Sequence, residues 1–272
     1  MKTLKKLLVL IFIGLLLTGC GAKDTGSDDK KVITVAASPV PHAEILEEAK
    51  KILAEQGYDL QITVFEDYVQ PIEVVESDEI DCNYFAHTPY LDNYNETNGA
   101  SQVVVAGIHY EPFGIYPGTK SSIADLEDGD AIAVPNDTTN EARALLLLAA
   151  NGIIELPENA GLTITKNDIV KYNVDVDIVE LEAAQVARVI PEVALVVLNG
   201  NYALEAGLSV GKDSIAFEAV DSLAAETYVN VVAVKAGNEN NEGVKALVEV
   251  LQSDAITNFI NDTYDGAVVP FK

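Results

Sequence analysis

The stretch DCNYFAHTPY, at residues 81–90, contains the pattern around which we interpret the rest of the chain. Its first residues alternate as in a β-strand, so Phe85 and His87 are expected to point to the same side. Pro89 favours the first turn of a helix, which allows Tyr90 to lean back toward those two rings. The stretch therefore predicts a strand-to-helix corner where three flat side chains form a slot for a thin apolar group. The alternative is that Phe85 and Tyr90 belong to an ordinary core and that His87 is a surface histidine.

Before this stretch, short β-branched runs alternate with helical patterns. Strands are predicted at 32–37 and 60–65, each followed by a helix, and the stretch above supplies a third strand. Such an alternation predicts a parallel sheet with helices on both faces. Ligands of these sheets bind beyond the carboxyl ends of the strands. In this chain that edge would gather Ser38, Tyr68 and residues 85–90.

The same alternation restarts after an extended passage rich in proline and glycine at 111–118, which we interpret as a crossing between two lobes. Beyond it we predict strands at 131–135, 174–181 and 193–198, helices at 141–151 and 183–189, a returning β-branched run at 227–234, and final helices at 242–252 and 254–263 before a polar tail. The expected fold is α/β, with two lobes and two hinge crossings. Lobe 1 would contain residues 32–115 plus 229–272, and lobe 2 residues 116–228.

The N-terminus has the features of an export signal. Three lysines precede an apolar run at 7–17, which is shorter than the ~20 residues that span a bilayer but suits a signal-peptide core. The small residues before Cys20 resemble a bacterial lipobox, in which the cysteine becomes the lipidated first residue. We therefore expect a signal peptide at 1–19 and a lipidated Cys20 with a flexible tether at 20–31. Acyl chains such as palmitate on Cys20 would hold the protein at the extracytoplasmic face of the cell membrane.

Composition excludes some classes of partner. The formal net charge is −26, and removal of the lysine-containing signal makes it more negative. A surface this acidic argues against nucleic acid and against anionic lipid as ligands. With Cys20 lipidated, Cys82 has no partner for a disulfide.

Catalytic motifs are missing from the sequence. It contains no G-x-S-x-G elbow, no phosphate-binding G-x-x-x-x-G-K-[ST] loop and no dinucleotide fingerprint after a strand. The three histidines, His42, His87 and His109, are spread along the chain, whereas a zinc site normally gathers several histidines, cysteines or carboxylates. We therefore predict neither an enzyme, nor a cofactor, nor a metal site.

Residues suited to recognition are better represented. Arg143 follows the polar loop 136–140 at the start of a predicted helix, where a guanidinium and free backbone N–H groups together suit a carboxylate. The alternative is that Arg143 pairs with a surface glutamate. Asn199 and Asn230 end or interrupt apolar strand runs, where an amide facing a cleft could bind an ammonium group. For Asn199, which Gly200 follows, a turn is the alternative.

The chain resembles the NlpA-type lipoproteins, which are methionine-binding receptors of ABC importers. The resemblance covers nearly the whole mature chain, and it rests on the lipobox and on residues 36–46, 65–71, 81–92, 134–148 and 198–203. It implies a periplasmic-binding-protein-like (type II) fold. It also implies a monomeric, lipid-anchored receptor that captures L-methionine or a close analogue and delivers it to an ABC permease and its ATPase.

In that family, four rings from the first lobe sandwich the thioether, and an arginine holds the α-carboxylate. The matching ring positions are Tyr68, Phe85, His87 and Tyr90, and the matching positions around the amino-acid head group are Asn140, Arg143, Asn199 and Asn230. Aromatic contacts with a polarizable sulfur are worth ~0.3–1.5 kcal/mol each. Because the slot belongs to one lobe and most of the head-group contacts to the other, binding should close the cleft.

The sequence departs from the family pattern at two places in the predicted second lobe. Val-Ile-Pro-Glu stands at 189–192, where relatives commonly carry acidic residues, and the segment 221–226 is unusual. These departures leave D-methionine, a methionine dipeptide or another small amino acid as alternative ligands. The rival of a different class is a surface adhesin or immunogenic lipoprotein that keeps the fold without a working cleft.

Overall fold

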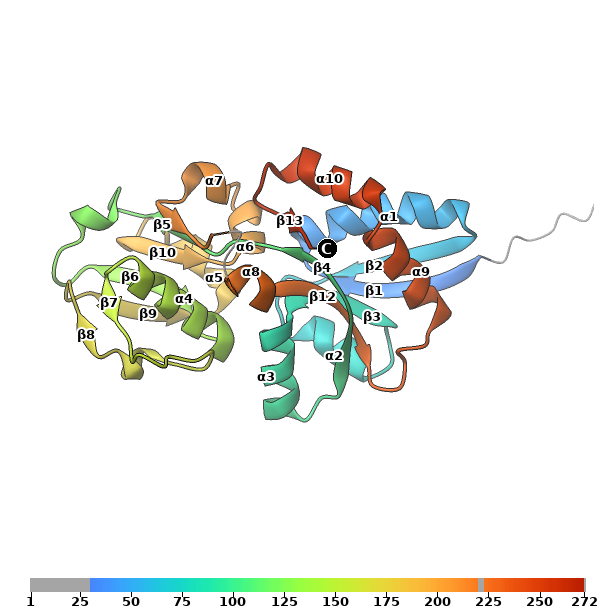
Figure 1. The fold of residues 1–272 in the computed structure, drawn as a ribbon, viewed down its shortest axis with the longest axis horizontal. Coiled ribbons are helices and arrows are strands. Elements are labelled where there is room, and N and C mark those ends of the chain that lie inside the picture. The colour runs from blue at the N-terminus through green and yellow to red at the C-terminus, as the bar shows by residue number, and fades with distance from the viewer. Residues whose placement is uncertain (1–29, 220–222, 272) are drawn as a thin grey trace, which may run out of the picture.

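Two β-sheets divide the protein into two lobes, as Figure 1 shows. The computed structural model describes residues 30–219 and 223–271. The predicted signal peptide, Cys20 and nearly all of the tether lie outside the described residues, as does the beginning of the segment 221–226. Within the described ranges, no helix combines the length and the apolar character needed to cross a membrane.

Lobe 1 is built on a sheet with the strand order β13-β4-β12-β3-β1-β2. Its strands are β1 (Lys31–Ala37), β2 (Tyr58–Val64), β3 (Cys82–His87), β4 (Gln102–Tyr110), β12 (Val229–Lys235) and β13 (Val269–Pro270). As predicted, β1 pairs in parallel with β2 and β3, but β12 is antiparallel to β3 and β4. The sheet is therefore mixed, because β12 enters it from the other lobe rather than through a helix of lobe 1.

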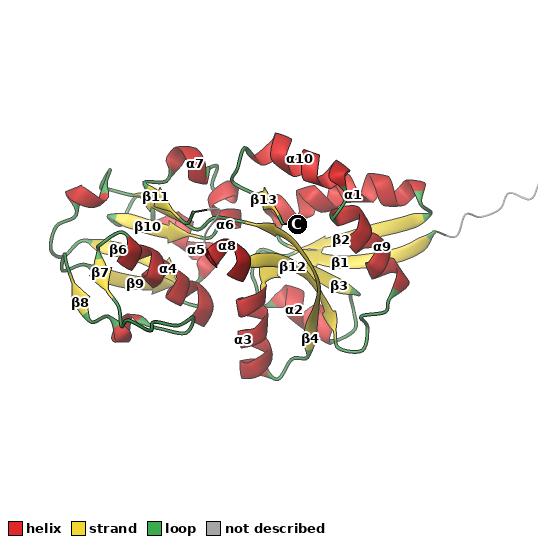
Figure 2. Ribbon diagram, in the orientation of Figure 1, coloured by secondary structure: helices red, strands yellow, loops and turns green. Residues whose placement is uncertain are grey.

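Helices cover both faces of this sheet, with α1, α9 and α10 on one side and α2 and α3 on the other (Figure 2). Their bounds are α1 (Glu44–Glu55), α2 (Gln70–Glu76), α3 (Thr88–Asn98), α9 (Glu242–Leu251) and α10 (Asp254–Tyr264), and a short turn η1 (Pro39–Ala43) precedes α1. Leu46, Leu53 and Leu247 recur on the inner faces of α1 and α9 and are fully buried in one core cluster.

The polar tail predicted after the last helix is wrong. Ala267 and Val268 are buried, and β13 extends the sheet by pairing Val269 with Tyr110 of β4. The short run Ala-Val-Val-Pro therefore covers the outer edge of β4 instead of extending into solvent.

Lobe 2 contains a smaller mixed sheet with the strand order β11-β5-β10-β6-β9. Its strands are β5 (Gly114–Pro117), β6 (Ala131–Pro135), β9 (Asp177–Leu181), β10 (Leu195–Leu198) and β11 (Ala216–Phe217), with a separate hairpin of β7 (Ile154–Glu155) and β8 (Lys171–Tyr172). Its helices are α4 (Thr138–Ala150), α5 (Ala183–Val186), α6 (Gly200–Glu205), α7 (Val210–Asp213) and α8 (Leu223–Thr227). Leu145 and Leu148 of α4 pack with Ile132 and Leu195 in the core of this lobe.

The two crossings are short. All of β5 pairs with strands of the second sheet, so the first crossing runs through residues 111–113, just before the boundary predicted at 115. The second crossing leads into β12, which begins at Val229 in the first sheet. Both crossings lie beside the cavity described next.

Candidate functional site

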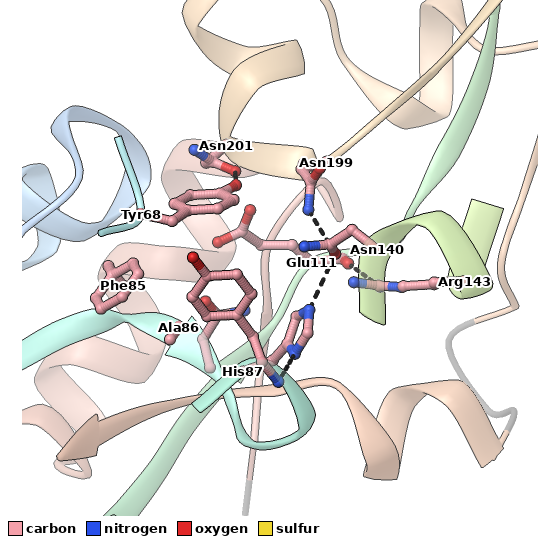
Figure 3. A pocket seen from close by; sticks show the side chains of 12 residues that line it. Tyr68, Phe85, Ala86, His87, Glu111, Asn140, Arg143, Asn199 and Asn201 are labelled. Carbon is pink, nitrogen blue, oxygen red and sulfur yellow. Dashed lines mark hydrogen bonds between the residues drawn. The ribbon is translucent and has the colours of Figure 1, made fainter. Parts of the chain in front are cut away.

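A cavity lies between the two lobes, where the carboxyl end of β3 faces the first turns of α4 and α6 (Figure 3). About 330 Å³ in and around it, open solvent at its mouth included, is not filled by protein atoms. The residues that line it are Tyr68, Phe85, Ala86, His87, Tyr90, Glu111, Asn140, Arg143, Asn199, Gly200, Asn201 and Asn230. All eight residues named from the sequence are among them, so the structure brings them together at one place.

The rings of lobe 1 form one wall of the cavity. The ring of Tyr68 lies 5.8 Å from that of Phe85 and 5.5 Å from that of Tyr90, and Phe85 and Tyr90 meet edge to face at 6.2 Å. Such spacings are typical of interacting aromatic side chains, ~4.5–7 Å between centroids. Tyr202 of lobe 2 lies over Tyr68 at 5.0 Å. The wall is therefore a group of flat apolar surfaces that suits an unbranched side chain.

His87 ends β3 and caps α3. Its Nδ1 accepts a hydrogen bond from the backbone N–H of Tyr90 at 3.1 Å, which draws Tyr90 back toward the strand as the position of Pro89 predicts. His87 is only 6% exposed, so it is not a surface histidine. Burial, and then the charge of Arg143, lower the pKa of His87 to about 3, and the imidazole is neutral. Since Nδ1 accepts, Nε2 carries the proton and donates to Asn140 Oδ1 at 3.0 Å.

Asn140 joins the two lobes at the base of the cavity. Asp137 caps α4 by accepting from the backbone N–H of Asn140 at 3.0 Å, and it also accepts from Nδ2 of Asn140 at 2.9 Å. The Oδ1 atom of Asn140 therefore faces away from Asp137, and it accepts from His87 and from Nδ2 of Asn199 at 2.9 Å. Asn140 is thus held between His87 and Asn199, and its amide group is not free to donate a hydrogen bond to a ligand.

Arg143, one turn further along α4, lines the cavity and is 3% exposed. Its Nε and Nη2 donate to the two carboxylate oxygens of Glu218, at 2.8 and 2.6 Å, and Nη2 also donates to the backbone oxygen of Glu111 at 3.0 Å. The sequence left open whether Arg143 faces a ligand or pairs with a surface glutamate. The structure pairs it with Glu218, and Arg143 also lines the cavity. The paired glutamate is not on the surface, because its side chain is only 10% exposed.

Glu111 and two histidines form a second buried group beside Asn230. His109 Nε2 lies 2.7 Å and His42 Nε2 lies 3.4 Å from Oε1 of Glu111, and His42 Nε2 lies 3.0 Å from Asn230 Oδ1. Burial raises the pKa of the Glu111 carboxyl and lowers the pKa of His42 to about 4 and that of His109 to about 3. The hydroxyl of Tyr84 bonds to Nδ1 of His109, so Nε2 of His109 donates to Glu111.

This group changes one expectation from the sequence. His42 and His109 are separated in the sequence but adjacent in space, and with Glu111 they offer three donor atoms within 4.8 Å of one another, which is a set that zinc accepts. In the structure these atoms share hydrogen bonds with one another and with Tyr84 and Asn230. The two histidines contact the Glu111 carboxyl group, and Glu111 lines the cavity.

Three further contacts connect the lobes across the cavity. The hydroxyl of Tyr68 donates to Oδ1 of Asn201 at 2.5 Å, and the hydroxyl of Tyr202 donates to the backbone oxygen of Glu66 at 3.0 Å. The backbone N–H of Asn201 hydrogen-bonds to the carboxylate of Glu111. The structure is therefore that of a closed cleft.

Two amide atoms of the lining are buried without a partner among the described residues. These are Oδ1 of Asn199, an acceptor, and Nδ2 of Asn201, a donor. A buried amide atom without a hydrogen bond costs ~1–3 kcal/mol. The side chain of Asn201 also interacts with the Glu205 carboxylate, so the clearest unused group is the acceptor Oδ1 of Asn199, which suits a ligand with an ammonium group.

Sequence reasoning missed four lining residues: Ala86, Glu111, Gly200 and Asn201. Ala86 and Gly200 contribute backbone and space, and no side-chain pattern marks them. Glu111 stands at the start of the predicted crossing, two residues after His109, and Asn201 belongs to the same Asn-Gly-Asn run as Asn199. A polar residue within a predicted crossing was the available signal for Glu111.

The chain is similar over nearly its whole length to known lipoproteins. The family described as NlpA lipoprotein matches residues 33–272. The methionine-binding lipoprotein MetQ of Bacillus subtilis is 39% identical over 267 residues, which are 97% of this chain and 96% of that protein. A lipoprotein of Ruminococcus gnavus is 64% identical, with a TM-score of 0.88 over 89% of this chain and 100% of that chain. A nutrient-binding protein of Burkholderia cenocepacia bound to methionine is 37% identical, with a TM-score of 0.83 over 88% of this chain and 100% of that chain.

Proposed function

Because the chain belongs to the NlpA lipoprotein family, we propose that it is a substrate-binding protein that captures L-methionine for an ABC importer. The names of its relatives support an amino-acid ligand and a lipoprotein rather than an enzyme. The two-lobe fold with a cavity at the crossings supports capture by closure of the cleft.

One observation carries the proposal: the ring wall of lobe 1 and the polar groups around Arg143 border the same cavity. In the proposed complex the thioether lies among Tyr68, Phe85 and Tyr90, where sulfur–aromatic contacts favour it. The α-ammonium lies at Glu111 and at the unused Oδ1 of Asn199. The carboxyl group lies at Arg143.

The assembly around this receptor is part of the same proposal. Lipid on Cys20 anchors the protein at the extracytoplasmic face of the cell membrane, and the polar stretch up to residue 31 gives it reach. The receptor acts as a monomer that docks on a permease driven by a cytoplasmic ATPase. The proposal includes no cofactor and no nucleic acid.

Ligand release and titration test the proposal. Mass spectrometry of the denatured, purified protein is expected to show methionine, because a closed cleft retains its ligand through purification. Calorimetry on protein stripped of ligand is expected to show tight binding of L-methionine, weaker binding of norleucine, and no binding of isoleucine, whose β-branch does not fit between the rings. Titrating D-methionine and glycyl-methionine in the same way decides between the alternative ligands. If none of these compounds binds, the receptor proposal is wrong and the adhesin alternative gains support.

A further inference from the structure

The guanidinium of Arg143 already forms an ion pair with a carboxylate of the same chain, that of Glu218. Glu218 follows it by 75 residues and pairs with it side-on, Oε1 with Nε at 2.8 Å and Oε2 with Nη2 at 2.6 Å. The side chains are 4% and 10% exposed, so both charges are largely withdrawn from water. Burial opposes the charge on each group, but their mutual attraction raises the pKa of Arg143 and keeps the pKa of Glu218 below its usual value.

Glu218 is also held from the side of the hinge. Its Oε2 accepts from the hydroxyl of Tyr110 at 2.6 Å and from the backbone N–H of Phe113 at 3.0 Å. A carboxylate with this many donors stays ionised and stays in place. Glu218 is therefore a permanent partner of Arg143 rather than a surface group that a ligand displaces.

This pairing limits what Arg143 can offer a ligand. A bidentate grip on a carboxylate needs donors from two nitrogens on one edge of the guanidinium. Glu218 occupies the edge formed by Nε and Nη2, and the remaining bond of Nη2 goes to the backbone oxygen of Glu111. None of the hydrogen bonds that Arg143 donates to Glu218 and Glu111 uses Nη1. A ligand therefore meets one nitrogen of the guanidinium, Nη1, which can donate a hydrogen bond to a neutral carbonyl oxygen as readily as to a carboxylate oxygen.

The charges around the cavity lead to the same conclusion. The lining contains one cation, Arg143, and one carboxylate, Glu111, while His87 is neutral and Glu218 lies directly behind Arg143. A ligand carboxylate at Nη1 would share one guanidinium with Glu218 in surroundings that exclude water, where like charges repel strongly. An ammonium group at Glu111 meets a carboxyl group whose side-chain partners, His42 and His109, are both neutral.

We propose that Glu218 is a specificity-determining residue that makes the site select its ligand by ammonium group and side chain, and tolerate loss of the carboxylate charge. The site then binds α-amino amides, with methionine amide as the model compound, alongside the free amino acid. This inference rests on the proposed function.

Calorimetric titration of the purified, ligand-stripped protein tests it with three compounds: L-methionine, L-methioninamide and N-acetyl-L-methionine. The amide is expected to bind within about 10-fold of methionine, whereas the N-acetyl compound, which lacks the ammonium group, loses at least about 100-fold. In Glu218→Gln the preference for methionine over its amide is expected to rise at least about 10-fold, since no second anion then competes for Arg143. Glu158→Gln, which removes an exposed charge from the same lobe, is the matched control and leaves the preference unchanged.

Each outcome of these titrations either supports or overturns the inference. A loss of more than 100-fold for the amide in the unmodified protein overturns the inference without any variant, so the test survives if Glu218→Gln does not fold. A Glu218→Gln protein that binds both compounds more weakly by the same factor shows a merely structural role and also overturns it. If methionine and its amide both fail to bind the unmodified protein while another amino acid binds, it is the choice of methionine in the proposed function that has failed, and the acid-to-amide comparison is repeated with that ligand.

Discussion

Gly200, the first residue of α6 in lobe 2, lies directly against Glu111, the first residue of the crossing that leaves lobe 1. A Cβ atom at Gly200 would come within 2.7 Å of Cβ and 2.8 Å of Oε2 of Glu111. The φ angle of Gly200 is not in the left-handed region. This position therefore needs glycine for the close approach to Glu111 and not for its backbone conformation. The approach allows the backbone N–H of Asn201 to reach the Glu111 carboxylate, so the contact belongs to the closed cleft.

Gly200→Ala is therefore expected to oppose closure. The added methyl group has to displace Glu111 or open the cleft, so we expect at least about 10-fold weaker binding of methionine. The free energy of unfolding should change little. Alanine favours a helix over glycine by up to ~1 kcal/mol, which acts against the cost of the added methyl group. Calorimetry measures the affinity, and small-angle scattering should show a larger radius of gyration. The matched control is Gly211→Ala, where an added Cβ meets nothing within 4 Å; equal affinities for both variants would show that the contact has no part in closure.

Arg143→Ala is expected to cost both binding and stability. Without its partner, the Glu218 carboxylate is left buried and unpaired, which destabilises a protein by ~3–5 kcal/mol. Binding should fall at least about 10-fold for methionine and for its amide alike, because Nη1 serves either oxygen. Urea unfolding and calorimetry measure the two effects separately.

The double variant Arg143→Met/Glu218→Gln separates the two effects of Arg143. It removes both charges and keeps a side chain of similar volume, so most of the lost stability should return. Binding of the ligand should stay weak, since the methionine side chain introduced at position 143 has no donor to replace the guanidinium. Recovery of affinity together with stability would remove Arg143 from the ligand site.

Two substitutions of Tyr68 distinguish its hydroxyl from its ring. Tyr68→Phe deletes the bond to Asn201, so methionine and alanine should both bind about 3- to 10-fold more weakly, as expected for one hydrogen bond of ~1 kcal/mol. Tyr68→Ala also removes the ring next to Phe85 and Tyr90, and should weaken methionine by about a further 10-fold but alanine hardly at all. Titration of both ligands against both variants is the measurement. Equal losses for the two ligands in Tyr68→Ala would contradict a thioether among the rings.

Much of the fold was predictable from the sequence because its information is local. Alternating runs mark the strands, and Pro89 after a strand marks the corner at His87. The eight residues of the candidate site come from five segments of the sequence and were named together through the resemblance to the NlpA-type lipoproteins, and all eight line one cavity.

The features of the fold and of the site that could not be predicted depend on contacts between segments that are distant in the sequence. Nothing near Glu218 in the sequence indicates that it meets Arg143, and the pairing appears only when the strand β11 lies beside β5. Likewise, His42, His109 and Glu111 gather because η1 and the end of β4 meet at the hinge. The antiparallel direction of β12 and the pairing of β13 follow from chain returns that periodicity does not record.

The stability of lobe 2 is expected to depend on pH through Glu141. This residue is 4% exposed, and its Oε1 accepts from the backbone N–H of Lys166 at 2.8 Å. Burial raises the pKa of Glu141 to about 7, although the Lys166 N–H opposes the shift, and the neighbouring Glu180 adds to it. Since the folded-state pKa exceeds the ordinary value of 4.5, the contribution of Glu141 to stability is complete below that pH and is lost as the pH rises through 7.

Glu141→Gln reproduces the protonated side chain, which accepts from Lys166 and donates to Glu180. We expect this variant to be more stable than the unmodified protein by roughly 1 kcal/mol at pH 8. The shift of the pKa from 4.5 to about 7 corresponds to about 3.5 kcal/mol at ~1.4 kcal/mol per pKa unit, which solvent screening reduces. The difference should disappear near pH 5, where Glu141 is already protonated. Urea unfolding at pH 5, 6.5 and 8 measures it, with the exposed Glu158→Gln as the control. A gain that is the same at all three pH values would instead reflect packing, since only the titration of Glu141 makes the gain grow as the pH rises.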